Sequence, residues 1–121
     1  MHVLFLTDDL LFASRIQAAA SDLKLDVQIA APSKAATLAS DPDCQLVLAD
    51  LFVLGDKAEE IIPQVKANFP QARLIGFGPH VDVTMLTKAK AAGCDEVLTR
   101  GEFQRQFSDL LSNAAQNIQA R

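Results

Sequence analysis

The chain has 121 residues, half of them hydrophobic, and a formal net charge of -4. This length fits one domain, residues 1–121, that is able to bury a core, and the composition excludes a disordered chain. Because Lys and Arg are not clustered, the sequence lacks the positive patch that binding to nucleic acid or to an anionic membrane requires.

Apolar runs stop well short of the roughly twenty residues that cross a bilayer. The first residues, MHVLFLTDDLL, also lack the cationic start and long apolar stretch of a signal peptide. We therefore expect a cytosolic protein in which Cys44 and Cys94, which lack metal-binding spacing, remain free thiols.

Short strand-like runs alternate five times with helical patterns along the chain. Residues 2–6 are the first predicted strand, and apolar residues at three- and four-residue steps predict a helix over 10–23. Residues 26–30 are the second strand, and Pro32 marks the start of a helix that runs through Leu38. The third strand covers 45–49. The next helix lies within 57–69, where Pro63 has to occupy a first turn or cause a kink.

The fourth predicted strand covers residues 72–77, and Asp82 is the expected N-cap of a helix that stops at Gly93. Residues 95–99 are the fifth strand, and an apolar stripe over 103–118 predicts the last helix. Strands that alternate with helices predict right-handed crossovers and a parallel sheet covered on both faces. The fold class is thus α/β, a single (βα)5 doubly wound sheet in the flavodoxin-like order 2-1-3-4-5.

In such sheets, ligands bind beyond the carboxyl ends of the strands. The first strand ends in Asp8 and Asp9 and the third in Asp50, so these three acids should meet at one edge. Close carboxylates repel, and Mg²⁺ with oxygen ligands is the cation that would neutralise them. The alternative for Asp8 or Asp9 is a helix cap. Arg100 ends the fifth strand at the same edge.

The segments LFLTDDLL, LVLADL and KAAGCDEVLTRGEF together resemble the receiver domain of two-component response regulators, which has a CheY-like fold, over essentially the whole chain. The resemblance implies that Asp50 is the phosphoacceptor and that Mg²⁺ is held by Asp8, Asp9, Asp50 and the backbone carbonyl of Phe52. It also implies a sensor histidine kinase or another signalling protein as partner. A homodimer through the face of the fourth helix, fifth strand and fifth helix is a further expectation.

Several positions depart from the receiver pattern. Gly78 stands where the family has a Ser or Thr hydroxyl, and Arg100 and Gly101 replace a Lys-Pro pair. An Arg can hold a phosphate in place of the Lys, but its guanidinium is longer and planar. Val97 replaces an aromatic residue. The apolar segment 51–54 we expect to be partly buried.

The leading hypothesis is a stand-alone atypical receiver domain in phosphorelay signalling, a phosphoprotein that is not an enzyme and acts through protein–protein contact. The first alternative is a pseudo-receiver scaffold that works without phosphorylation, because the hydroxyl at Gly78 is missing. The second alternative is a small flavodoxin-like nucleotide-binding enzyme, which the absence of Trp and Tyr disfavours. With only His2 and His80 present, no Ser-His-Asp set can be assembled, and His80 is expected to be solvated.

Overall fold

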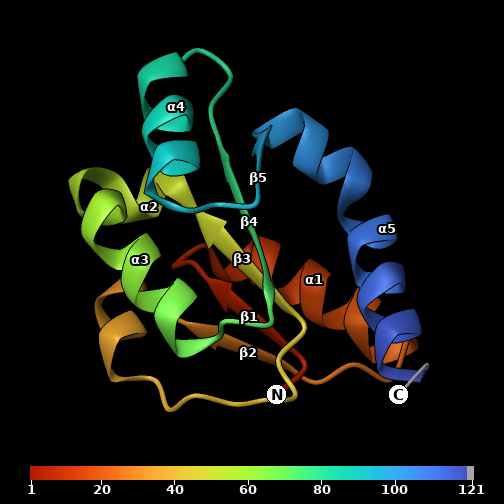
Figure 1. Ribbon diagram of the computed structural model, residues 1–121. Coiled ribbons are helices and arrows are strands. Elements are labelled where there is room, and N and C mark those ends of the chain that lie inside the picture. The colour runs from red at the N-terminus through yellow and green to blue at the C-terminus, as the bar shows by residue number, and fades with distance from the viewer. Residues whose placement is uncertain (120–121) are drawn as a thin grey trace.

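The computed structural model describes the backbone of residues 1–119 and the side chains of residues 1–118. Five parallel strands form one sheet in the order β2-β1-β3-β4-β5 (Figure 1), as the sequence predicted. The strands are β1 (Val3–Leu6), β2 (Val27–Ala30), β3 (Leu46–Asp50), β4 (Arg73–Gly78) and β5 (Glu96–Thr99). β1 and β3 are neighbours, with Leu6 paired to Ala49, so the chain leaves both strands at the same edge of the sheet.

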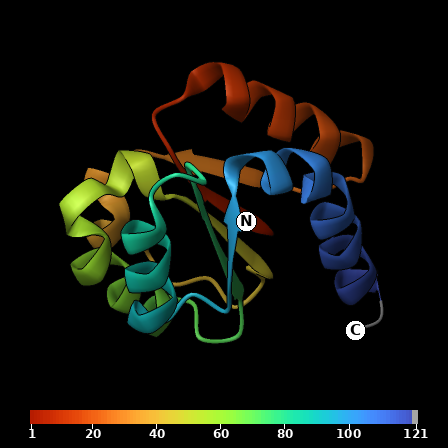
Figure 2. The ribbon, with the colours of Figure 1, turned by 90° about the horizontal axis from the view of Figure 1, so that it is seen from above.

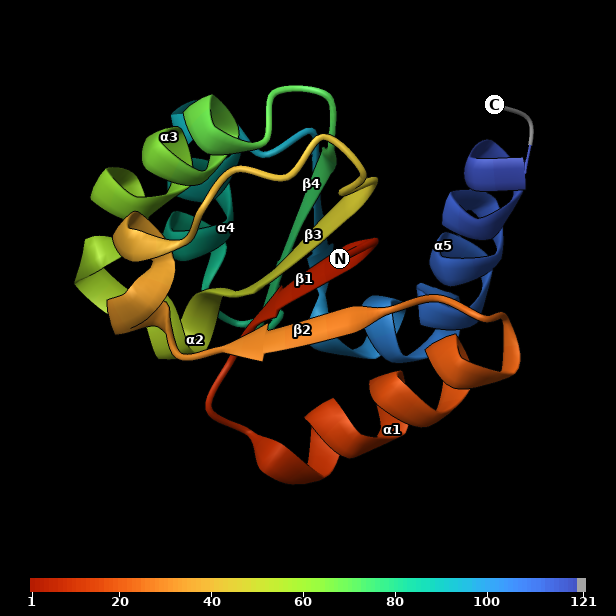
Figure 3. The same cartoon turned by 90° about the horizontal axis from the view of Figure 1, so that it is seen from below.

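Helices cover both faces of the sheet (Figures 2 and 3). They are α1 (Leu10–Asp22), α2 (Leu51–Leu54), α3 (Ala58–Asn68), α4 (Val83–Ala92) and α5 (Arg100–Gln119), with the 3-10 helices η1 (Pro32–Thr37) and η2 (Gly55–Lys57). One core lies between the sheet and the pair α1 and α5, and a second core lies under η1, α2, α3 and α4. None of the helices within residues 1–119 is long and apolar enough to cross a membrane.

The core on the α1 and α5 side is rich in aromatic rings. The rings of Phe77 and Phe103 stack with centroids 4.0 Å apart, and Phe5 and Phe12 pack around them at about 6 Å. Phe12 comes from the first turn of α1, and Phe103 comes from the first turn of α5. This cluster therefore fixes where the two helices begin relative to the carboxyl ends of β1 and β5.

Two crossovers differ from the prediction. The segment after β2 forms the short helix η1 instead of an α-helix, because only Ala35 among its six residues is buried and it has no apolar stripe. The segment after β3 begins a helix at once, at Leu51, and passes through η2 into α3. Pro63 occupies the sixth position of α3, so of the two alternatives the first turn is excluded, and a kink at Pro63 stays a prediction. Pro63 lies on the exposed side of the helix, where the carbonyl that it leaves unpaired can bind water.

Candidate functional site

Asp50 lies at the carboxyl end of β3 and is almost completely buried, with 2% of its surface exposed. Its Oδ2 accepts a hydrogen bond of 2.9 Å from the Oγ1 of Thr7, which follows β1 and is equally buried. The Thr7 hydroxyl in turn accepts the backbone N–H of Asp9 at 3.0 Å. Thr7 therefore links the ends of the two central strands. Sequence analysis missed this residue, although its position directly after the β1 run was a usable signal.

The second carboxylate oxygen of Asp50 has no hydrogen-bond partner. Oδ1 is buried, and it is the one buried side-chain nitrogen or oxygen without a partner in the described part of the chain. Burial raises the pKa of Asp50 above its ordinary value of 3.8, and the Thr7 hydrogen bond only partly offsets this. Burial at this position thus disfavours the ionised form of Asp50.

Asp9 is occupied at both of its oxygens. Oδ1 caps α1 by accepting the backbone N–H of Phe12 at 3.1 Å, and Oδ2 accepts the guanidinium of Arg100 at 3.0 Å. The Phe12 amide and the Arg100 guanidinium hold the pKa of Asp9 below its ordinary value. Of the two predicted roles, helix cap and metal ligand, the structure shows the cap for Asp9.

Arg100 lies where the sequence placed it, at the start of α5 and at the carboxyl edge. Besides the ion pair to Asp9, its Cζ lies 5.6 Å from the centroid of the Phe12 ring. Its positive charge also favours the ionised form of Asp50, against the larger effect of burial. The guanidinium is therefore within electrostatic reach of both strand-end acids.

The structure does not bring the three predicted acids together as a metal-binding group. Asp8 is exposed, and among the described residues no group of three or more His, Cys, Asp or Glu side chains could hold a metal ion. The unpaired Oδ1 of Asp50 would suit a cation, but both oxygens of Asp9 are already engaged. A Mg²⁺ ion would therefore find one buried carboxylate oxygen without a partner, on Asp50, and would compete with Arg100 and the α1 cap for Asp9. The carbonyl of Phe52 as a ligand remains a prediction.

The positions that depart from the receiver pattern lie around this edge. Gly78 is buried at the end of β4, where an added Cβ would lie 3.2 Å from the Sδ of Met85, so the Met85 side chain fills the space beside it. Val97 is half-buried on β5 and packs against the core under α4. In the apolar segment after Asp50, Leu51 and Leu54 are buried as expected, but Phe52 is 67% exposed.

Phe52 belongs to a set of exposed apolar side chains that gather at the carboxyl edge. The large hydrophobic residues with exposed side chains are Leu10, Leu11, Phe52, Val81 and Val83. They follow β1, β3 and β4, which are adjacent in the sheet. We call these five residues the apolar rim. Exposed apolar groups gathered in one region are typical of contact surfaces.

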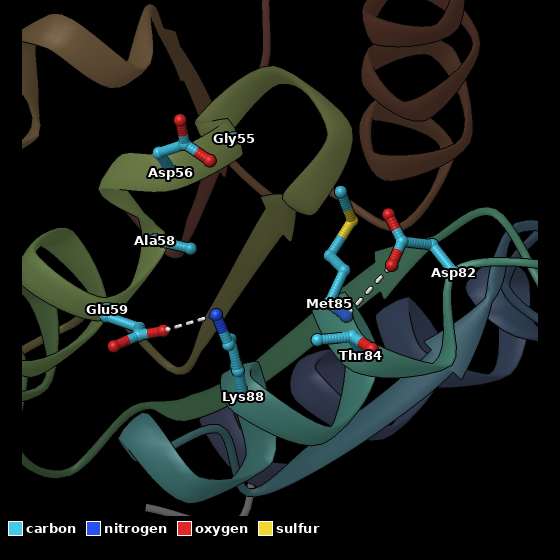
Figure 4. Close-up of a pocket in the computed structure, with 8 residues that line it drawn as sticks. All are labelled: Gly55, Asp56, Ala58, Glu59, Asp82, Thr84, Met85 and Lys88. Carbon is cyan, nitrogen blue, oxygen red and sulfur yellow. Dashed lines mark hydrogen bonds and ion pairs between the residues drawn. The ribbon is translucent and has the colours of Figure 1, made fainter.

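A separate pocket of about 430 Å³ lies between α3 and α4 (Figure 4). Its lining residues are Gly55, Asp56, Ala58, Glu59, Asp82, Thr84, Met85 and Lys88. Lys88 and Glu59 face each other across it at 3.5 Å, and Asp82 accepts the backbone N–H of Met85 to cap α4, as predicted. The lining does not include Asp9, Asp50 or Arg100. His80, on the turn before α4, is exposed, as expected.

No protein-family model matches the chain, and no curated protein matches it in sequence. Solved structures with a similar fold do match the chain. A response regulator from Thermotoga maritima is 16% identical over 94% of this chain and 96% of its own, with a TM-score of 0.74. A protein assigned to pilus assembly (cpaE) from Burkholderia thailandensis is 16% identical over 94% and 97%, with a TM-score of 0.72.

A third similar structure is a response regulator protein from Burkholderia pseudomallei with a phosphorylated aspartic acid, a calcium ion and citrate. It is 19% identical over 98% of this chain and 70% of its own, with a TM-score of 0.70. At these identities the likeness establishes the fold alone. The chain therefore has the CheY-like fold of response regulator receiver domains, as its sequence pattern predicted.

Proposed function

We propose that this chain is a pseudo-receiver, a signalling domain of the receiver type that acts through protein–protein contact without phosphorylation at Asp50. The burial of Asp50 carries the proposal. An aspartate that attacks phosphorus must be ionised and must reach the phosphoryl donor in line with the leaving group. The burial of Oδ1 hinders the approach of a phosphoryl donor to Asp50, and burial raises the pKa of Asp50, which disfavours its ionised form.

The apolar rim supports a role in protein contact. Leu11 is 85% exposed and Phe52 is 67% exposed, although both adjoin buried residues. The face of α4, β5 and α5 that the sequence suggested for a partner or homodimer has a shallow hollow of its own, of about 480 Å³, lined by Leu86, Thr87, Lys90, Ala91 and Val97. A signalling protein as partner, the homodimer and a cytosolic location all belong to the proposal.

The second candidate is the phosphoacceptor role with Mg²⁺ at Asp50. The unpaired Oδ1 at the carboxyl end of β3 favours it, because that atom is the one that a phosphoryl group or a cation would satisfy. The Burkholderia pseudomallei response regulator with a phosphorylated aspartic acid and calcium shows that this fold accommodates both groups. For this chain, Arg100 would have to leave Asp9 to reach the phosphoryl group.

Intact-mass analysis after incubation with acetyl phosphate and Mg²⁺ separates the two candidates. For the pseudo-receiver we expect no added phosphoryl mass in the parent protein, as in the Asp50→Asn variant. A phosphoryl adduct on the parent that Asp50→Asn abolishes would establish the second candidate instead.

Photo-crosslinking in cells tests the contact role independently. A photoreactive residue at Phe52 should capture the same partner in the parent and in the Asp50→Asn background. In the matched control, the photoreactive residue replaces Gln28. This residue is exposed on β2, the outermost strand of the sheet on the side away from β5. Equal capture from both positions would count against the apolar rim as a contact surface. Capture that Asp50→Asn abolishes would contradict independence from phosphorylation.

A further inference from the structure

The edge that carries Asp9 and Asp50 already contains a cation of its own. The Arg100 guanidinium donates to Asp9 Oδ2 at 3.0 Å, and the Phe12 amide occupies the other oxygen at 3.1 Å. Neither oxygen of Asp9 is thus left without a hydrogen bond. An incoming divalent cation would have to compete with Arg100 and with the cap of α1 to use Asp9 as a ligand.

Arg100 is held in place from more than one direction. Its guanidinium lies over the Phe12 ring, at 5.6 Å from the centroid, as well as against the Asp9 carboxylate. The helix that begins at Arg100 is itself fixed, because Glu102 accepts the Thr99 amide at 2.9 Å and the Thr99 hydroxyl accepts the Glu102 amide at 3.2 Å. This reciprocal pair is a capping box, which holds the first turn of α5.

The same guanidinium also acts on Asp50, whose ionised form its charge favours. The contact that the structure shows for this guanidinium at the strand ends is the ion pair with Asp9. The third acid, Asp8, is exposed. A guanidinium stays protonated at all physiological pH values, whereas a bound metal ion exchanges with the solution.

We propose that Arg100 is the built-in counter-ion of Asp9 at the edge that also carries Asp50, and that its positive charge there keeps out a divalent cation. Mg²⁺ requires oxygen ligands at about 2.1 Å in octahedral geometry, so it would compete for Asp9 with the positive charge of an arginine already bound to that carboxylate. The inference concerns cation binding alone. It can fail while the proposed signalling role stands, and the reverse also holds.

Paramagnetic broadening by Mn²⁺ tests the proposal on the full chain, with no phosphoryl donor present. In the parent we expect no saturable broadening of the amide signals of residues 8–10 and 50–52 at up to about 1 mM Mn²⁺. Arg100→Gln should gain saturable broadening at these residues, with affinity about tenfold or more above that of the parent. Mg²⁺ should reverse the broadening by competition.

Arg15→Gln is the matched control, because Arg15 lies over the same Phe12 ring at 5.6 Å but is exposed and makes no ion pair with Asp9. It should behave like the parent. Arg100→Lys keeps a positive charge without the planar guanidinium and should bind Mn²⁺ with intermediate affinity. If Arg100→Gln does not fold, the Arg100→Lys variant is measured in its place. Saturable binding at this edge in the parent, or no gain in the Arg100 variants, overturns the proposal.

Discussion

At the scale of single residues, the site is a chain of short contacts between strand ends. Asp9 donates its amide to Thr7, and Thr7 donates its hydroxyl to Asp50, which is left with one buried unpaired oxygen. An isolated buried carboxylate costs free energy unless it is paired. The fold keeps Asp50 at that cost, which is why we assign it to the functional edge and not to ordinary packing.

The cost of burying Asp50 predicts that Asp50→Asn stabilises the protein at neutral pH, by about 1 kcal/mol or more. Because burial raises the pKa of Asp50 in the folded state above its ordinary value of 3.8, the folded protein holds this proton more tightly than the unfolded chain. The contribution of Asp50 to the free energy of unfolding of the parent is therefore most favourable below pH 3.8. It becomes less favourable as the pH rises through the raised pKa of Asp50.

Urea unfolding of parent and Asp50→Asn from about pH 4 to pH 8 measures this effect, and the advantage of the variant should grow with pH. Asp109→Asn, which removes an exposed acid on α5, is the control and should show no such growth. An advantage that is the same at every pH, or a variant less stable than the parent throughout, would contradict the assignment.

The close packing around Gly76 predicts that adding a side chain at this position destabilises the protein. A Cβ at Gly76 would lie 3.0 Å from the Sγ of Cys94 and 3.2 Å from Leu51, both fully buried. Gly76→Ala should therefore destabilise the protein by about 1 to 2 kcal/mol. Gly78→Ala should cost less, because its nearest neighbour at 3.2 Å is the flexible, half-buried Met85 side chain. Thermal unfolding of both variants checks the order, and equal or reversed losses would show that the Cys94 contact relaxes freely.

At the scale of elements, side-chain caps fix where three of the helices begin. Asp9 fixes the start of α1, Asp82 the start of α4, and the Thr99 and Glu102 pair the start of α5. Each start lies at the carboxyl edge of the sheet, and Asp9 serves both as a cap and as the partner of Arg100. Gly93 ends α4 with a φ of +133°, a conformation that glycine adopts without strain.

The end of α1 uses a less suitable residue. Lys24 has a φ of +59° directly after the helix, while the Leu25 amide donates to Ala20 and the Lys24 amide donates to Ser21. This is a Schellman motif, whose left-handed position favours glycine. We expect Lys24→Gly to stabilise the protein by about 0.5 to 1 kcal/mol. Urea unfolding measures it, and Lys34→Gly, an exposed change inside η1, should destabilise instead.

At the scale of the whole molecule, the sheet separates two cores and gathers the exposed apolar residues at one edge. All five residues of the apolar rim follow strands β1, β3 and β4, whereas the opposite edge carries ion pairs such as Lys66 with Asp95 and Arg73 with Glu96. The carboxyl edge therefore combines exposed apolar side chains with the Arg100–Asp9 ion pair, and exposed apolar residues of this kind are typical of contact surfaces.

Substitutions of the adjacent residues Leu11 and Phe12 should distinguish a role in partner contact from a role in stabilising the fold. Leu11 is 85% exposed, and Phe12 is 5% exposed within the aromatic cluster of α1, β4 and α5. Leu11→Ala should change the free energy of unfolding by about 0.5 kcal/mol or less, whereas Phe12→Ala should cost about 3 to 5 kcal/mol. Chemical denaturation measures both. A large loss in Leu11→Ala would mean that the apolar rim serves the fold and not a partner.

Local patterns in the sequence were enough for the strands and for the caps at Asp82 and Gly93. The strand order, and with it the placement of Asp50 and Arg100 at one edge, followed from the fold class that these patterns indicate. Apolar periodicity and capping depend on neighbours along the chain, so they can be read without coordinates. The short η1 and the interior position of Pro63 could not be predicted in this way, because they depend on which side of the segment faces the core.

Only the tertiary structure decided how the charges at that edge are distributed. The sequence placed three acids and one arginine together, but the spacing is equally compatible with a shared metal ion and with an internal ion pair. The structure shows the ion pair: Arg100 crosses to Asp9 over the Phe12 ring, Asp8 is exposed, and Asp50 is enclosed beside Thr7. Electrostatic pairing depends on distances between residues far apart in the chain, and those distances exist only once the sheet has formed.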